Sequence, residues 1–277
     1  MSTTPSNIPI LPKLKKESIK TLIAKGLRVD GRKLDEYRKI IIEPNYIPKA
    51  EGSALVRIGE TIVLVGIKME VGQPFPDTPD EGVLMVNAEF VPFASPTFEP
   101  GPPDENAIEL ARVIDRSLRE IKVIDLEKLA IVPGQKVWIV WVDIYVLNHA
   151  GNLLDASSLA TMAALMTTKI PKVEVEENEI KIDKTMKEQP LPLNHRVVTV
   201  TVGKLDEYLL VDPTDEEELV LDAKLAISVS EDGRIAGMQK MGPGDFTLDE
   251  VNKAVELALK SAKSLHGILE EYVSKTS

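Results

Sequence analysis

The spacing of hydrophobic and polar residues changes several times along the chain, and each change predicts an element. Strands are predicted at 39–42, 54–58, 61–71, 83–91, 136–147, 196–202, 208–211, 223–230 and 234–241. Helices are predicted from Pro12 up to Gly26, at 105–121, at 153–168 and at 247–273. Strands followed by a helix, twice over, predict an α+β fold with two similar halves.

Turn and capping signals support this division. Gly59-Glu60 and Asp232-Gly233 are typical of hairpin turns, and Thr247-Leu-Asp-Glu250 is a capping box. The charged segment at 172–194, which contains two prolines, is predicted to cross the surface between the halves. We therefore predict three units: a basic helical arm (1–39), a first half (40–171), and a second half with the C-terminal helix (172–277).

Composition excludes several kinds of site. The chain has no cysteine, which excludes disulfides, thiolate zinc sites and a thiol nucleophile. It also lacks a Walker loop, a dinucleotide-binding fingerprint and a His-Glu-x-x-His motif. We therefore predict no metal and no cofactor. The longest strongly apolar run, Val137 to Val142, is far too short to span a membrane, and no signal peptide is visible, so a cytoplasmic protein is expected.

Charge is distributed unevenly. The net charge is −11, yet residues 1–39 carry ten Lys and Arg against four acids, while residues 205–222 carry eight acids and no base. A basic arm on an acidic body is typical of a chain with a partner or ligand on one side. A solvated helix and a solvated loop explain the pattern equally well. For the acidic run from Asp212 to Glu218 the solvated loop is favoured over a cation site or a general acid.

The predicted helix at 105–121 has a basic stripe. Arg112, Arg116 and Arg119 fall within about 60° of arc, opposite the apolar face. Guanidinium groups one turn apart can follow the phosphates of a single nucleic-acid strand. Glu105 and Glu109 lie on the same stripe, so helix-stabilising ion pairs, such as one between Glu109 and Arg112, are the alternative.

A second candidate site is the step from strand to helix at Gly151-Asn152. Free backbone N–H groups at such a helix start commonly bind anions. Asp155, in the first turn, is expected to stabilise the helix start and to repel a phosphate there.

Several motifs together resemble one family, the RNase PH-like phosphorolytic exoribonucleases. Arg28-Val-Asp-Gly-Arg32 is similar to the opening box of the family, and 52–68 to its first core hairpin. Asp143 to Asp155 is similar to its phosphate-site loop, and Asp212-Pro-Thr to a strand end in its second half. The resemblance covers nearly the whole chain and implies two βαβα-type halves of the ribosomal-protein-S5-domain-2-like class.

The chain departs from the catalytic pattern of this family at both parts of the active site. Catalytic members have an arginine and a hydroxyl residue in the phosphate loop, where this chain has Gly151, Asn152, two leucines and Asp155. Alignment on Asp212 places Glu218 and Lys224 where catalytic members carry two aspartates. Phosphorolysis needs a bound phosphate and a group that stabilises the leaving 3′ oxygen. We therefore predict no catalytic residue and degenerate phosphate and acid positions.

The resemblance is strongest to the non-catalytic ring subunit of the archaeal exosome. It implies a hetero-hexameric ring, a trimer of dimers with a catalytic RNase PH-like subunit, together with RNA-binding cap subunits. It also implies that Arg112, Arg116 and Arg119 guide single-stranded RNA toward 3′→5′ phosphorolytic degradation. Two alternatives remain open: an active exoribonuclease with an altered site that uses Asp212, Asp215 or Glu218, and a pure assembly module without RNA contact.

Overall fold

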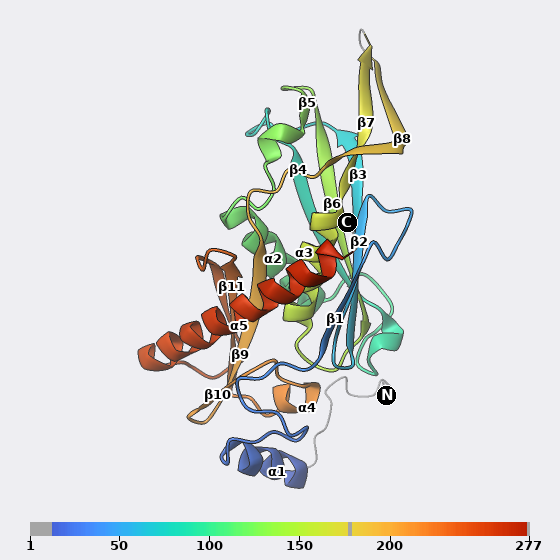
Figure 1. Ribbon diagram of the computed structural model, residues 1–277. Helices are drawn as coiled ribbons and strands as arrows, with labels where there is room; N and C mark the ends of the chain where they lie inside the picture. The colour runs from blue at the N-terminus through green and yellow to red at the C-terminus, as the bar shows by residue number, and fades with distance from the viewer. Residues whose placement is uncertain (1–12, 177–178, 276–277) are drawn as a thin grey trace, which may run out of the picture.

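The computed structural model describes residues 13–176 and 179–275 (Figure 1). Its helices are α1 (Lys13–Ile23), α2 (Glu105–Glu120), α3 (Leu153–Thr167), α4 (Asp215–Glu218) and α5 (Leu248–Ser274), with short 3₁₀ helices η1 (Pro92–Ala94) and η2 (Leu126–Leu129). Its strands are β1 (Ile40–Pro44), β2 (Gly52–Ile58), β3 (Thr61–Gly72), β4 (Val83–Phe90), β5 (Ala130–Val132), β6 (Lys136–Asn148), β7 (Lys169–Glu176), β8 (Glu179–Pro190), β9 (Val197–Leu205), β10 (Tyr208–Val211), β11 (Ala223–Ser230) and β12 (Ile235–Met241).

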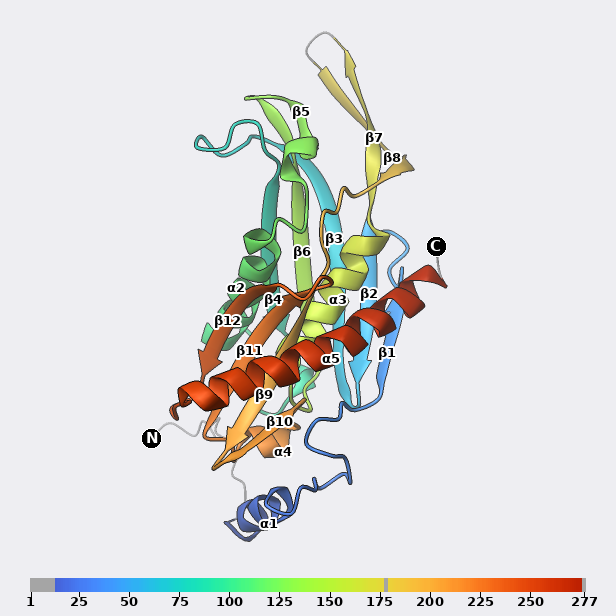
Figure 2. The same cartoon turned by 60° about the vertical axis from the view of Figure 1, so that its left-hand side comes forward.

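Two sheets with their helices make up the body of the molecule. The first sheet has six strands in the order β1-β2-β3-β6-β4, with β5 paired to β6, and only β4 and β6 are parallel within it. The second has four antiparallel strands in the order β10-β9-β11-β12. Helix α3 contacts β2, β3 and β9, and α5 contacts β9 and β11 (Figure 2). The predicted α+β fold with two similar halves is confirmed.

Local signals placed the turns and helix starts correctly. Gly59-Glu60 separates the cross-strand pair of Ile58 and Thr61. In the β11–β12 turn, Gly233 has a φ of +83°, a conformation that glycine adopts without strain. The Thr247 side chain accepts a hydrogen bond from the Glu250 backbone N–H, which confirms the predicted capping box.

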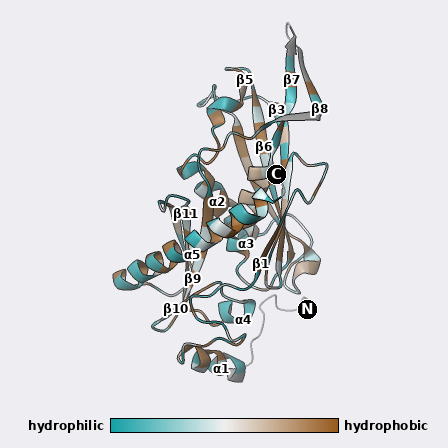
Figure 3. Ribbon diagram, in the orientation of Figure 1, coloured by the Kyte–Doolittle hydropathy of each residue, from teal (hydrophilic) through white to brown (hydrophobic). Residues whose placement is uncertain are grey.

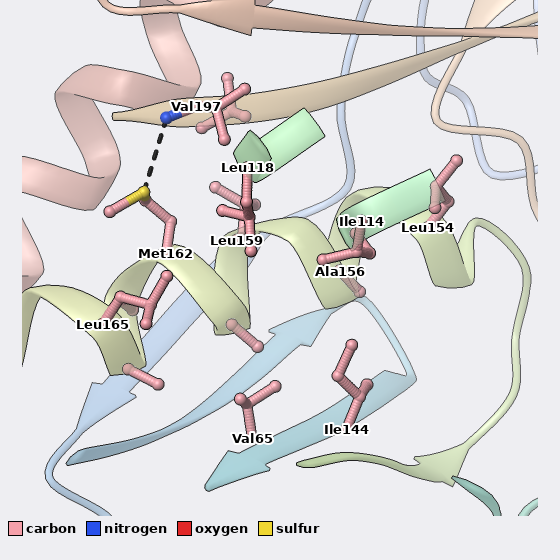
Figure 4. Packing of buried hydrophobic residues seen from close by; sticks show 14 of the residues in the cluster. Val65, Ile114, Leu118, Ile144, Leu154, Ala156, Leu159, Met162, Leu165 and Val197 are labelled. Atoms are coloured by element: carbon pink, nitrogen blue, oxygen red, sulfur yellow. Dashed lines mark hydrogen bonds between the residues drawn. The ribbon is translucent and has the colours of Figure 1, made fainter. Parts of the chain in front are cut away.

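Helix α3 is the centre of the core and is buried along most of its length. Figure 4 shows Leu159 and Ala156 of α3 above Val65 and Ile144 of the first sheet. On the opposite side the Met162 sulfur accepts a hydrogen bond of 3.5 Å from the Val197 backbone N–H of β9. The Ala- and Ser-rich sequence of α3 lets both sheets approach the helix closely, because small side chains leave little bulk between the layers.

The N-terminal helix α1 packs at one end of the body, near α4 and β10 (Figure 1). Ile19 and Ile23 are fully buried against Leu205, Leu210 and Val220. The helix ends at Ile23, just before the predicted stop at Gly26, whereas its predicted start at Pro12 lies outside the described residues.

The segment at 172–194, predicted to cross the surface between the halves, contains strands that were not predicted. Strands β7 and β8 form a two-stranded ribbon that projects from the body at the end opposite α1 (Figures 1 and 2). Helix α3 ends at Thr167, and β7 begins at Lys169. Pro171 therefore lies inside β7, and the strand register shifts there. A ribbon that projects away from the core needs no strongly apolar face, so its charged sequence did not show a strand pattern.

Candidate functional site

The step from β6 to α3 is fixed by its backbone. Gly151 has a φ of +89°, and a Cβ atom there would lie 2.4 Å from the backbone nitrogen of Asp215. Asn152 follows with a φ of 54° and precedes the first turn of α3. The Asp215 N–H donates to the Ala150 carbonyl oxygen at 3.2 Å. The predicted phosphate loop therefore packs directly against the start of the predicted acidic run.

The two predicted degenerate acid positions also meet at this loop. Lys224 Nζ donates to Glu218 Oε1 at 2.8 Å, and the side chains are 27% and 17% exposed. The backbone N–H of Asn152 also donates to Glu218 Oε1, at 3.4 Å. The N–H at the start of α3 therefore faces a carboxylate of the chain itself.

Asp155 does not have the expected role at the helix start. It is fully buried and turned toward β9, where Thr201 donates to it from Oγ1 at 2.7 Å and from its backbone N–H at 3.0 Å. Tyr37 Oη donates at 2.6 Å and Asn152 Nδ2 at 2.8 Å. Burial raises the pKa of Asp155 to about 6, although these four hydrogen bonds oppose the shift. Asp155 joins the two halves and the arm rather than repelling an anion at the loop.

The acidic run is not a solvated loop. Residues 215–218 of this run form α4, which Figure 3 shows as hydrophilic. Two acids of the run from Asp212 to Glu218 are nevertheless buried, namely Asp212 and Glu217. Arg28 is also buried and donates to both carboxylate oxygens of Glu217, and to the carbonyl oxygens of Val211 and Asp212 at 2.8 and 2.7 Å.

Asp212 is held in the same way by Arg38. The guanidinium group donates to Asp212 from Nη2 at 2.6 Å and from Nε at 2.8 Å, and Nη1 donates to the Ala150 carbonyl oxygen at 2.6 Å. Arg32 Nη1 donates to Asp212 Oδ2 at 3.0 Å. Burial by itself would raise the pKa of Asp212, but Arg38 beside it holds that pKa below its ordinary value. The Asp212 carboxylate is thus bound by arginines of the chain itself.

Sequence reasoning did not assign a role to Arg28, Arg32 or Arg38 as ligands of the acidic run. Its only signal was the charge asymmetry between the arm and residues 205–222. That asymmetry pointed to an external partner, whereas a large part of it is neutralised inside the chain.

A cavity of about 320 Å³ opens beside the loop. Glu218 and Lys224 line it together with a stack of three rings. The ring centroids of Phe90 and Phe98 are 4.8 Å apart, and those of Phe98 and His149 are 5.6 Å apart. Burial lowers the pKa of His149, so its ring is uncharged at neutral pH and its Nδ1 accepts from the Gly151 N–H at 3.2 Å. No motif in the sequence indicated this stack.

The basic stripe of α2 lies on the surface, as predicted, but its three arginines differ. Arg112 is exposed and has no ion pair or side-chain hydrogen bond within residues 13–176 and 179–275. Arg116 makes one long contact of 3.4 Å to Gln239. Arg119 donates to Asp115 at 2.8 Å and to the Leu84 carbonyl oxygen. The alternative pair between Glu109 and Arg112 is absent from this described part of the chain, and Glu109 instead accepts from Gln239.

Two features are absent from the described residues. Among the described residues no group of three or more His, Asp or Glu side chains is placed to hold a metal ion. In the same part of the chain no helix is both long and apolar enough to cross a membrane.

Comparison with known proteins decides the family. Residues 36–171 match the model for domain 1 of the 3′ exoribonuclease family (RNase PH), and residues 195–261 match the model for domain 2. The chain belongs to the 3′ exoribonuclease family. The RNase PH-like two-domain α+β fold implied by the sequence motifs is confirmed.

Archaeal members of the 3′ exoribonuclease family are similar over the full length. The exosome complex component Rrp42 of Sulfurisphaera tokodaii is 54% identical over 99% of this chain and 100% of the relative. The exosome complex component Rrp42 of Saccharolobus solfataricus is 52% identical, over 99% of each chain.

Two solved structures are similar to this chain in fold. A structure described as the Archaeoglobus fulgidus exosome with RNA bound to the active site contains a chain that is 47% identical, with a TM-score of 0.84 over 92% of this chain and 97% of that one. Rice Rrp46, at 19% identity and a TM-score of 0.69 over 89% of this chain and 100% of that one, shares the fold.

Proposed function

We propose that this chain is the non-catalytic ring subunit of an archaeal exosome. It assembles with a catalytic RNase PH-like subunit into a hetero-hexamer, a trimer of dimers, to which RNA-binding cap subunits attach. In that ring it completes the catalytic subunit's active site and guides single-stranded RNA for 3′→5′ phosphorolysis. Full-length similarity to archaeal proteins named as exosome components supports this assignment.

The observation that carries the loss of catalysis is the Glu218 carboxylate between Lys224 and the N–H of Asn152. An anion that belongs to the chain stands where a phosphorolytic enzyme needs a phosphate. The loop 150–156 supplies no arginine to compensate for it. Asp212, which the alternative of an altered active site would use, is buried and bound to Arg38. These features favour a subunit without activity of its own.

Guidance of RNA rests on Arg112 and Arg116. Exposed guanidinium groups one helical turn apart hold a phosphate backbone without reading its sequence, because their ligands are phosphate oxygens rather than base edges. Arg119 is the weakest of the three candidates, because its guanidinium group is engaged by Asp115 and Leu84.

The first experiment separates catalysis from assembly. The purified chain, the catalytic partner and their mixture are each incubated with single-stranded RNA, phosphate and magnesium, and the release of nucleoside diphosphates is followed. We expect no release from the chain alone and greater release from the mixture than from the partner. Release by the chain alone that Glu218→Gln abolishes would overturn the proposal in favour of an active enzyme.

The second experiment separates RNA guidance from pure assembly. We expect the assembled ring with Arg112→Gln and Arg116→Gln to bind single-stranded RNA more weakly, with a salt slope reduced by about 0.7 for each lost contact. Arg234→Gln is the matched control, because Arg234 is an exposed arginine in the β11–β12 turn whose side chain pairs with its neighbour Asp232 and with His195. Unchanged affinity in the double variant would favour the pure assembly module.

Two further predictions remain proposals. We place the protein in the cytoplasm, where a soluble RNA-degrading complex would meet its substrates. We also retain the division into an arm (1–39), a first half (40–171) and a second half (172–277). Limited proteolysis tests the division, because cleavage is expected first near its boundaries.

A further inference from the structure

The C-terminal half of α2 borders a surface hollow of about 450 Å³ that is richer in cations than in acids. It is lined by Arg112, Asp115, Arg116, Arg119, Glu120 and Lys122. Four of these side chains are cationic and two are anionic, so the hollow favours an anionic ligand although the chain as a whole is acidic.

The backbone conformation at Lys122 places this residue in the lining of the hollow. It lies two residues beyond the end of α2 at Glu120, and its φ of +50° is a left-handed conformation that redirects the chain just after the helix. Its N–H donates to the Arg119 carbonyl oxygen at 3.0 Å, and its own carbonyl oxygen accepts from Asn194 Nδ2 at 3.2 Å. The backbone of Lys122 is thus held on both sides, while its side chain is exposed and has no ion pair or hydrogen bond within the described residues.

Arg119 differs from Lys122 because its side chain already has partners within the chain. Its Nε donates to Asp115 in an ion pair of 2.8 Å and its Nη2 donates to the Leu84 carbonyl oxygen. A phosphate would have to share a guanidinium group whose charge is already balanced. The ammonium group of Lys122 has no partner among residues 13–176 and 179–275, and an unpaired cation contributes its full charge to counterion release when it binds a phosphate.

We propose that Lys122, rather than Arg119, makes the third phosphate contact beside Arg112 and Arg116. These three residues form the α2 track, and its ligand is the phosphodiester backbone of single-stranded RNA. Over its helical part, from Arg112 to the end of α2 at Glu120, the track spans about 12 Å at 1.5 Å per residue, long enough for more than one phosphate. Glu105 and Glu109 lie on the N-terminal side of Arg112, so the RNA runs from Arg112 toward Lys122 and away from the acidic end. This inference rests on the proposed function in RNA guidance.

The test compares single variants in the assembled ring. Arg112→Gln, Lys122→Gln, Arg119→Gln and the control Lys128→Gln are each titrated with single-stranded RNA over a range of salt concentrations. Lys128 is a suitable control because it is exposed, lies nearby in the sequence and pairs with Asp125 at 2.8 Å. For Lys122→Gln we expect the salt slope to fall by about 0.7 and the Kd at 0.1 M salt to rise about five-fold. For Arg119→Gln and Lys128→Gln the Kd is expected to stay within two-fold of that of the parent ring.

The outcomes distinguish this inference from the proposed function. If Arg112→Gln weakens binding but Lys122→Gln does not, the α2 track is wrong while RNA guidance stands. A larger loss of RNA affinity in Arg119→Gln than in Lys122→Gln, at equal thermal stability and ring size, would also overturn the assignment of Lys122. If neither Arg112→Gln nor Lys122→Gln changes the salt slope, RNA guidance by this chain fails as well.

Discussion

Replacing Arg28 by methionine is expected to destabilise the chain by about 3–5 kcal/mol. The side chain is buried, and it donates to both carboxylate oxygens of the equally buried Glu217. Methionine keeps much of the volume but leaves the carboxylate in the interior without its cation, and that uncompensated charge is the main cost. The carbonyl oxygen of Val211 also loses its donor. The expected loss is a large share of the roughly 5–15 kcal/mol by which domains are stable.

Urea unfolding at pH 7, followed by circular dichroism, measures this loss. Arg234→Met is the control, because its ion pair with Asp232 is about half exposed and such pairs contribute at most about 1 kcal/mol. Arg28→Met combined with Glu217→Gln completes a double-mutant cycle. We expect the double variant to lose less than the sum of the two single variants. A loss below about 1 kcal/mol in Arg28→Met, or strict additivity in the cycle, would refute the reasoning.

Three other substitutions test the core and the loop. Because burial raises the pKa of Asp155 from 3.8 to about 6, its contribution to stability is complete only well below pH 3.8 and is lost as the pH rises through 6. The free energy of unfolding of the parent minus that of Asp155→Asn should therefore fall by about 2 kcal/mol between pH 4 and pH 7, and a flat difference would contradict this. Gly151→Ala should cost more than about 2 kcal/mol in urea unfolding, because its Cβ would meet backbone atoms at 2.4 Å, whereas Gly233→Ala, with a similar φ and open space around it, should cost clearly less. Leu159→Ala, at a fully buried position in α3, should lower the free energy of unfolding by about 2–5 kcal/mol, and a smaller loss would mean that the core closes around the deletion.

The sequence was most informative where the deciding contacts are local. The exposed face of α2 follows from a 3.6-residue period, and the capping box of α5 follows from residues three positions apart. The departures from the family motif at Gly151, Glu218 and Lys224 were also predicted, because they need no coordinates to be seen, whereas the ion pair between Glu218 and Lys224 came from the structure. The ribbon of β7 and β8 was missed, since a projecting strand pair carries charge on its surfaces and resembles a loop.

The sequence by itself therefore determined the family, the order of most elements, the exposure of the α2 arginines and the lack of an arginine in the loop 150–156. Only the tertiary structure decided which charges meet. Arg28 and Glu217 are 189 residues apart, and Asp155 accepts hydrogen bonds from Tyr37 and from Thr201 of β9, which are both distant in the sequence. The physical reason is that the energy of a charge depends on its burial and on the groups around it, and those neighbours come from distant segments. Periodicity reports that a residue is inside or outside, but not which partner it finds there.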